Sequence, residues 1–149
     1  MKNKSQTPQK NGPMLQPETI SPHRILVVDN EADIRRLNAE LLIESGYQVD
    51  TAEDGALAWK ALQVKNYDLL ITDNSMPKVS GVELLRLIHQ ARIPLPVIMI
   101  SGTMPLDELK REPWLRIHSM LCKPYTLAEL LEKVKDLLNA PAIDRKPVA

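Results

Sequence analysis

Three short, uninterrupted apolar runs constrain this chain more than any other feature of its sequence. They are Ile25–Val28, Leu69–Ile71 and Val97–Ile100. Each run is too short for an ordinary helix or a membrane span, and each is followed by polar residues. Runs of this kind are typical of strands that are buried on both faces, as in a parallel sheet between two layers of helices.

Helical patterns separate these runs from one another and from two weaker strands. We expect helices over about 34–42, 54–64, 82–88, 105–112 and 127–138, and weaker strands over 47–52 and 117–122. Five strands that alternate with five helices predict βαβ units. The chain is therefore predicted to be an α/β protein, with a doubly wound parallel sheet and helices on both faces.

Polar, proline-rich segments flank this predicted body. Residues 1–23 hold four prolines among Lys, Asn, Gln, Ser and Thr, and predict a disordered N-terminal tail. Residues 140–149 hold two more prolines and predict a flexible C-terminal tail. One domain is expected between them, over 24–139.

The charge balance and the cysteine content exclude several classes of function. Lys plus Arg equals Asp plus Glu at 19 each, so no general attraction to nucleic acid or to anionic lipid is expected. The one cysteine, Cys122, predicts neither an internal disulfide nor a zinc site. No apolar stretch precedes Ile20, and no run is long enough to insert into a membrane. We expect a cytoplasmic protein.

Each of four predicted strands is followed by a residue that can act chemically. They are Asp29, Asp73, Ser101 and Lys123. Taken singly, Asp29 could cap the next helix, Asp73 could open a turn, and the other two could be ordinary loop residues. In doubly wound sheets, however, ligands bind beyond the carboxyl ends of the strands, where the winding reverses. With the strand order 2-1-3-4-5, this point brings the two carboxylates side by side.

Such a set of groups suits the transfer of a phosphoryl group. The carboxylates of Asp29 and Asp73, next to the amide of Asn30, form an oxygen-rich cleft of the kind that binds Mg²⁺. A carboxylate can act as a nucleophile and form an aspartyl phosphate. Charge neutralisation by Mg²⁺ and Lys123 would assist the transfer, and the Ser101 hydroxyl could bond a phosphate oxygen.

At these residues the chain resembles the receiver domains of two-component response regulators. The resemblance is carried, in order, by residues 25–31 (ILVVDNE), 73–77 (DNSMP) with Gly81 beyond, 101–102 (SG) and 123–125 (KPY). It covers roughly residues 24–139. It implies a flavodoxin-like fold, and a signalling module rather than an enzyme.

The resemblance assigns a role to each of these residues. Asp73 matches the phosphoacceptor, Ser101 the hydroxyl residue that moves toward the phosphate, and Lys123 the lysine that pairs with it. Pro124 implies a cis peptide bond after Lys123. The implied Mg²⁺ ligands are Asp29, Asn30, Asp73 and the main-chain carbonyl of Ser75.

The resemblance also implies the partners. A sensor histidine kinase or a histidine phosphotransfer protein would donate the phosphoryl group, docking near Ile34 and Leu37 on the first helix. A downstream protein target would read the face formed by the fourth and fifth helices and the strand between them.

Two residues depart from the receiver pattern. Asn30 stands where receivers usually have a second acidic residue, which should lower the affinity for Mg²⁺. Met120 stands where they usually have Tyr or Phe. Glu31 is expected on the following helix, pointing away from the site. These departures leave open a pseudo-receiver, in which the same fold serves as a phosphorylation-independent binding module.

Two enzyme classes fit the first strand end less well. A haloacid-type phosphatase would need a second aspartate two residues after its nucleophile, where this chain has Glu31. A nucleotide-binding fold of the common type would need a glycine-rich turn, and residues 29–31 contain no glycine.

Overall fold

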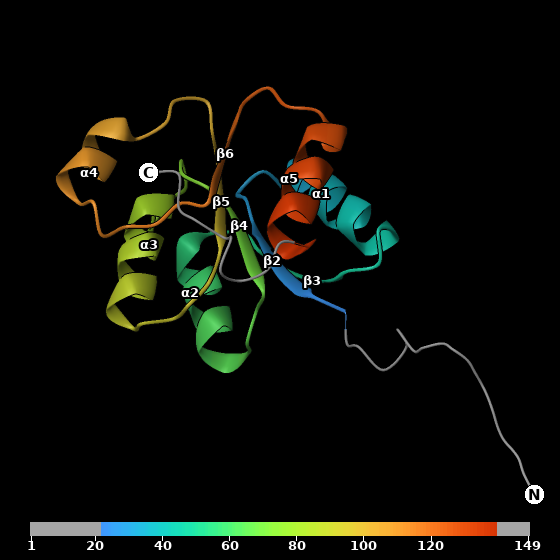
Figure 1. The fold of residues 1–149 in the computed structure, drawn as a ribbon, viewed down its shortest axis with the longest axis horizontal. Coiled ribbons are helices and arrows are strands. Elements are labelled where there is room, and N and C mark those ends of the chain that lie inside the picture. The colour runs from blue at the N-terminus through green and yellow to red at the C-terminus, as the bar shows by residue number, and fades with distance from the viewer. Residues whose placement is uncertain (1–21, 140–149) are drawn as a thin grey trace, which may run out of the picture.

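The five strands form one parallel sheet in the order β3-β2-β4-β5-β6 (Figure 1). The structure is a computed structural model that describes residues 22–139. Its strands are β2 (Arg24–Val28), β3 (Gln48–Ala52), β4 (Leu69–Asp73), β5 (Val97–Ser101) and β6 (Ser119–Cys122). The order confirms the predicted doubly wound, flavodoxin-like arrangement 2-1-3-4-5.

The register aligns the carboxyl ends of the inner strands at one edge of the sheet. Val28 pairs with Thr72 between β2 and β4, Asp73 pairs with Ile100 between β4 and β5, and Ser101 pairs with Cys122 between β5 and β6. The residues that end these strands, or directly follow them, are therefore neighbours in space.

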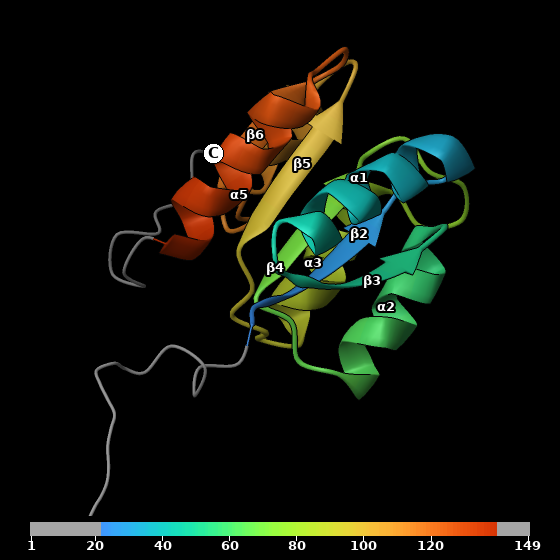
Figure 2. The ribbon, with the colours of Figure 1, turned by 90° about the vertical axis from the view of Figure 1, so that its right-hand side faces the viewer.

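Two layers of helices cover the sheet. Figures 1 and 2 show α1 (Ala32–Glu44) and α5 (Leu127–Asn139) on one face, and α2 (Gly55–Val64), α3 (Gly81–Gln90) and α4 (Leu106–Arg111) on the other. Each layer has its own hydrophobic core. Ile25 and Val27 of β2 pack toward α1 and α5, whereas Leu26 and Val28 pack toward the other layer.

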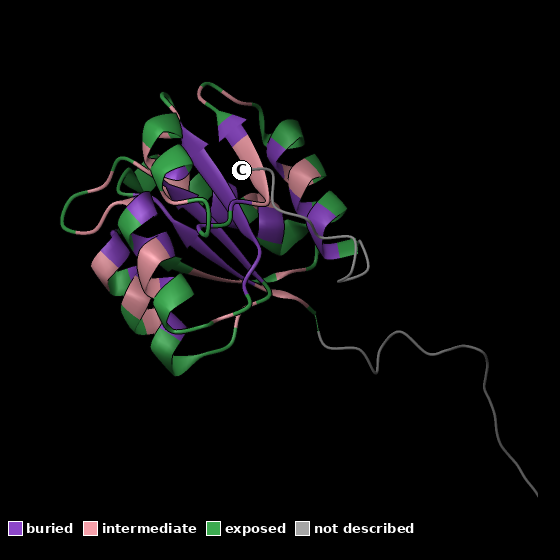
Figure 3. Cartoon of the chain, turned by 60° about the vertical axis from the view of Figure 1, so that its left-hand side comes forward, coloured by how far each residue is buried: buried purple, intermediate pink, exposed green. Residues whose placement is uncertain are grey.

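The sheet is buried on both faces because its central strands are apolar along most of their length, with polar residues only toward their carboxyl ends. Every residue of β4 and β5 is buried (Figure 3). The chain contains no Phe, so aliphatic side chains fill both cores. Each Leu, Ile or Val buried in this way contributes about 1.5–3 kcal/mol relative to an exposed position.

Side-chain caps fix where three of the helices begin. Asp54 Oδ1 accepts a hydrogen bond from the Leu57 N–H at 2.8 Å, at the start of α2. Ser80 and Glu83 form a reciprocal capping box at the start of α3. The same reciprocal pair of bonds joins Thr126 and Glu129 at the start of α5. These side chains accept hydrogen bonds from N–H groups that have no partner within the helix. They therefore fix the residue at which each helix begins, and with it the end of the preceding loop.

The predicted tails, at 1–23 and 140–149, lie outside the described residues except for Pro22 and His23, so the limits of the domain remain a prediction. Between residues 22 and 139, no helix has the length and apolar character needed to cross a membrane.

Gly55 allows α2 to pack directly against the loop between β4 and α3. A Cβ atom at this position would lie 2.2 Å from the carbonyl oxygen of Val79 and 2.7 Å from its Cβ. Because one obstructing group is backbone, a side chain could fit only if the helix or the loop moved.

Gly55→Ala is expected to lower the free energy of unfolding by about 1–3 kcal/mol, as overpacking does in tightly packed sites. Urea denaturation measures this change. Gly102→Ala is the matched control, because a Cβ there would meet no atom within 4 Å. Equal stability of the two variants would contradict the packing argument.

Candidate functional site

Two carboxylates lie side by side at the carboxyl edge of the sheet. Asp29 directly follows β2 and Asp73 ends β4, the adjacent strand. Each residue is only 2% exposed. The negative charge of Asp73 helps to raise the pKa of Asp29, after the larger effect of burial. The sheet thus holds two acidic groups close together in a place that water barely reaches.

Lys123, which directly follows β6, reaches this acidic pair from the neighbouring part of the sheet. Its Nζ donates a hydrogen bond to Asp73 Oδ2 at 3.0 Å, and the Asp73 side chain is 3% exposed beneath it. Burial lowers the pKa of Lys123, but the hydrogen bond and the charge of Asp73 outweigh that effect, so the pKa is raised. The Lys123–Pro124 peptide bond is cis, as the resemblance implied.

The second carboxylate oxygen of Asp29 is free to act as a ligand to a metal ion. Asp29 Oδ1 accepts a hydrogen bond from the Glu31 N–H at 2.9 Å, whereas Oδ2 is buried without a hydrogen-bond partner among the described residues. Burial of this carboxyl, opposed in part by the bond from Glu31, raises its pKa. An unpaired buried carboxylate oxygen is costly, and a hard divalent cation would satisfy it.

The rest of a ligand set would come from neutral oxygens. Among residues 22–139, no group of three or more His, Cys, Asp or Glu side chains could hold a metal ion. Asn30 is exposed directly after Asp29. Ser75 donates its N–H to Asp73 Oδ1 at 3.2 Å, so the backbone of this loop lies at the carboxylate. Two carboxylates, one amide and one main-chain carbonyl would suit Mg²⁺.

Ser101 lies near this cluster, but its hydroxyl is bonded elsewhere. Its carbonyl oxygen accepts a hydrogen bond from the Lys123 N–H at 3.0 Å, so the two residues are neighbours. Its hydroxyl donates to the Thr103 carbonyl at 2.6 Å and accepts from the Thr103 N–H at 3.2 Å. In this conformation, the Ser101 hydroxyl bonds the loop after β5 and does not bond Asp73.

The predicted orientation of Glu31 is wrong. Its Oε1 lies 3.6 Å from Lys123 Nζ, so the side chain reaches the site. The reason is that Glu31 is the N-cap of α1, with extended backbone angles, rather than a residue within the helix. The side chain is 58% exposed, and such pairs contribute little to stability. Its effect is to give Lys123 a second anionic partner at the rim of the site.

Three further side chains hold the site and were not expected from sequence. Arg35 donates to the Asp29 carbonyl at 2.8 Å. Asn38, only 2% exposed on α1, donates to the Tyr125 hydroxyl at 2.8 Å and so ties α1 to the segment after Pro124. Asn74 Oδ1 accepts from the Val82 N–H at 3.0 Å. The available signal was Asn38 itself, a polar residue on the otherwise apolar face of a predicted helix.

A family model described as the response regulator receiver domain matches residues 25–135. The chain is 32% identical over 119 residues to the chemotaxis protein CheY of Pseudomonas aeruginosa, which covers 78% of this chain and 96% of CheY. It is 36% identical over 127 residues to the sensor protein EvgS of Escherichia coli O157:H7, covering 84% of this chain and 10% of EvgS.

Among solved structures, the chain is similar to the response regulator protein TrrA of Thermotoga maritima, whose crystal structure is a complex with Mg²⁺-BeF. The match has a TM-score of 0.65 and 37% identity, and covers 76% of this chain and 97% of that one. The chain spans about half the length of several curated transcriptional regulatory proteins that it also matches.

Asp29→Asn is expected to raise the free energy of unfolding at neutral pH in the absence of Mg²⁺. The gain should be on the order of 1 kcal/mol, because the variant removes a buried charge whose second oxygen is unpaired. Since the pKa of Asp29 is higher in the folded protein than in the unfolded chain, its ionisation opposes folding by an amount that grows above the unfolded-chain pKa and is complete above the folded-state pKa. The gain should shrink as the pH is lowered through it.

Urea denaturation across the acid to neutral range measures this effect. Asp107→Asn, which alters an exposed carboxylate on α4, should change stability by less than about 0.5 kcal/mol at every pH. A destabilised Asp29→Asn protein at neutral pH would show that the carboxylate is stabilised where it lies.

Proposed function

The chain belongs to the response regulator receiver family, and on this premise we propose that it accepts a phosphoryl group on Asp73 from a sensor histidine kinase or a histidine phosphotransfer protein. The observation that carries the proposal is the position of Asp73. Its carboxylate lies at the carboxyl end of β4, bonded to Lys123 at 3.0 Å and next to the unpaired oxygen of Asp29.

The transfer would form one bond and break another. A carboxylate oxygen of Asp73 attacks the phosphorus of the donor's phosphohistidine, the new oxygen–phosphorus bond forms, and the phosphorus–nitrogen bond breaks to release the imidazole. Lys123 lies where it can pair with the phosphoryl oxygens. Because its ammonium now bonds the carboxylate directly, it has to shift toward the arriving phosphoryl group before that Asp73 oxygen can attack the phosphorus.

The proposed metal site uses Asp29, Asn30, Asp73 and the main-chain carbonyl of Ser75. When bound, Mg²⁺ would neutralise the negative charge of the phosphoryl group that arrives beside the two carboxylates. The chain's own contribution is positional: Glu31 N–H and Arg35 hold Asp29, and Ser75 N–H holds Asp73. These bonds fix both carboxylates before any ligand arrives.

Ser101 is proposed to report the modification. Its hydroxyl can exchange the Thr103 carbonyl for a phosphoryl oxygen, which would move the loop that leads from β5 to α4. Leu106 on α4 and Leu127 on α5 are exposed large apolar residues near this end of the fold, and they suit contact with a downstream protein target. Leu37, exposed on α1, suits contact with the donor. A kinase donor implies a cytoplasmic site of action.

A pseudo-receiver is the second candidate function. Asn30 removes one negative charge from the proposed metal site, and Met120 lies half-buried on β6 where receivers usually have an aromatic residue. A flexible methionine repacks with less steric demand than an aromatic ring. The retained Asp29, Asp73, Ser101 and Lys123 favour phosphorylation.

Incubation with acetyl phosphate and Mg²⁺, followed by intact-mass analysis, tests the main proposal. The parent protein and the Asp107→Asn control should gain one phosphate group. Asp73→Asn should gain none, because its amide is not a nucleophile for this reaction. Beryllofluoride with Mg²⁺ should likewise shift the amide spectrum of the parent but not that of Asp73→Asn. If the parent neither gains phosphate nor responds to beryllofluoride, the pseudo-receiver is the correct assignment.

Asn30→Asp is expected to raise the affinity for Mg²⁺ by roughly tenfold, since a third carboxylate strengthens a site for a hard cation. Asn30→Ala should lower the affinity, because it removes the amide oxygen altogether. Calorimetric titration with Mg²⁺ measures both. Unchanged affinity in the two variants would remove Asn30 from the proposed ligand set.

A further inference from the structure

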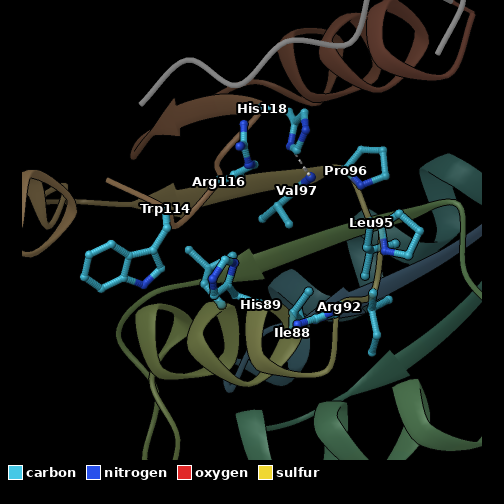
Figure 4. Close-up of a pocket in the computed structure, with 12 residues that line it drawn as sticks. Ile88, His89, Arg92, Leu95, Pro96, Val97, Trp114, Arg116 and His118 are labelled. Carbon is cyan, nitrogen blue, oxygen red and sulfur yellow. Dashed lines mark hydrogen bonds between the residues drawn. The ribbon is translucent and has the colours of Figure 1, made fainter. Parts of the chain in front are cut away.

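A cavity lies at the opposite end of the sheet from the acidic site. Its volume is about 500 Å³, within the range of small-molecule sites. It is bounded by the end of α3, the turn from α3 into β5, and the segment that leads into β6 (Figure 4). Val97, which lines it, begins β5, whereas the acidic site lies beyond the residue that ends this strand. The two sites are therefore separated by the length of a strand.

The floor of this cavity is apolar and one wall is aromatic. Leu85, Ile88, Leu95 and Val97 line it and are each at most 6% exposed. Trp114 also lines it, yet its side chain is 47% exposed, which is unusual for the largest apolar residue type. An exposed indole beside an apolar floor offers a planar ring a surface on which to stack.

The charged and titratable side chains that line the cavity are all basic, and they come from two sides of it, the end of α3 and the segment before β6 (Figure 4). His89, Arg92, Arg116 and His118 line the cavity, and none of its lining residues is acidic. Within residues 22–139, neither Arg92 nor Arg116 has an ion-pair partner. His118 Nδ1 accepts a hydrogen bond from the Val97 N–H at 3.2 Å, which holds its ring at the wall. Guanidinium groups of this kind match phosphate oxygens in geometry and charge.

Arg92 occupies a backbone position that favours glycine. Its φ is 57°, and it follows α3 in a Schellman motif. The Arg92 N–H donates to the His89 carbonyl at 3.0 Å, and the Ile93 N–H donates to the Ile88 carbonyl at 3.2 Å. Glycine is the usual residue at this point of the motif, because a side chain in the left-handed region is strained. Arg92 therefore lines the cavity from a backbone position that glycine would occupy without strain.

We propose that this cavity binds a phosphorylated small molecule with a planar ring, of the nucleoside phosphate class. The ring stacks on Trp114 above the apolar floor, and the phosphate pairs with Arg92 and Arg116. A cavity of about 500 Å³ suits a ligand of this size better than an extended peptide, which would need a longer groove. Binding requires neither phosphorylation nor Mg²⁺, so it is independent of the proposed function.

Adenosine monophosphate is the probe, added to the full chain without Mg²⁺ or phosphodonor and followed by amide and indole NMR signals. We expect saturable shifts at residues 88–97 and 114–118 and at the Trp114 indole. Adenosine and inorganic phosphate should each bind at least about tenfold more weakly than the monophosphate, because each lacks one of the two contacts.

Arg92→Gly separates binding from folding. It removes the guanidinium and relieves the left-handed backbone, so it should weaken the complex by about tenfold or more while the melting temperature is unchanged or higher. Lys78→Gly is the matched control. Lys78 is also a non-glycine cation at positive φ, 68°, but it lies outside the cavity. This variant should bind as the parent does.

Several results would overturn the proposal. They are the absence of saturable shifts at millimolar probe, equal binding of phosphate or adenosine alone, equal loss in the Lys78→Gly control, and shifts centred on Asp73 rather than on the cavity. Stronger binding of an acidic peptide than of the nucleotide would assign the cavity to a protein partner instead.

Discussion

The structure depends on the burial of two carboxylates beside a single ammonium group at the edge of a parallel sheet. Lys123 bonds Asp73, and one oxygen of Asp29 has no partner within the described chain. Burying like charges together is expensive, and one cation does not balance two anions. The fold tolerates this cost because the strands on which these residues stand are anchored by fully apolar cores on both faces. A divalent cation would balance the charge of the two carboxylates, in agreement with the proposed metal site.

Backbone N–H groups hold the two carboxylates in place, and contacts between side chains farther from them hold the surrounding segments. The N–H groups of Glu31 and Ser75 each donate to one of the carboxylates. Gly81 allows the loop after β4 to fold back on itself, since a Cβ there would lie 2.8 Å from the Asp73 carbonyl oxygen. Asn38 and Tyr125 connect α1 to the segment that carries Lys123. Geometry fixed in advance is what phosphoryl transfer requires, because its catalysis is mostly positioning and charge neutralisation.

The formal net charge of zero conceals a separation of charge along the strands. The carboxyl end of the sheet holds the acidic pair, and the amino end of β5 holds a cavity walled by arginine and histidine. The amino-acid composition gives only the total charge and does not show the charge at either end. The local field at each end, rather than the total charge, decides which ligand each one attracts.

The sequence by itself determined the fold class and the residues at the strand ends, and its resemblance to receiver domains implied the strand order. It could do so because burial on both faces imposes continuous apolar runs, which can be read from the residues of each strand alone. Only the tertiary structure decided the bonds of Ser101 to its own loop, the approach of Glu31 to Lys123, and the pairing of Asn38 with Tyr125. The basic cavity also became visible only there, since it gathers residues from α3, β5 and the segment before β6. These features depend on side-chain distances between segments far apart in the chain, and no local pattern of hydrophobicity or propensity encodes them.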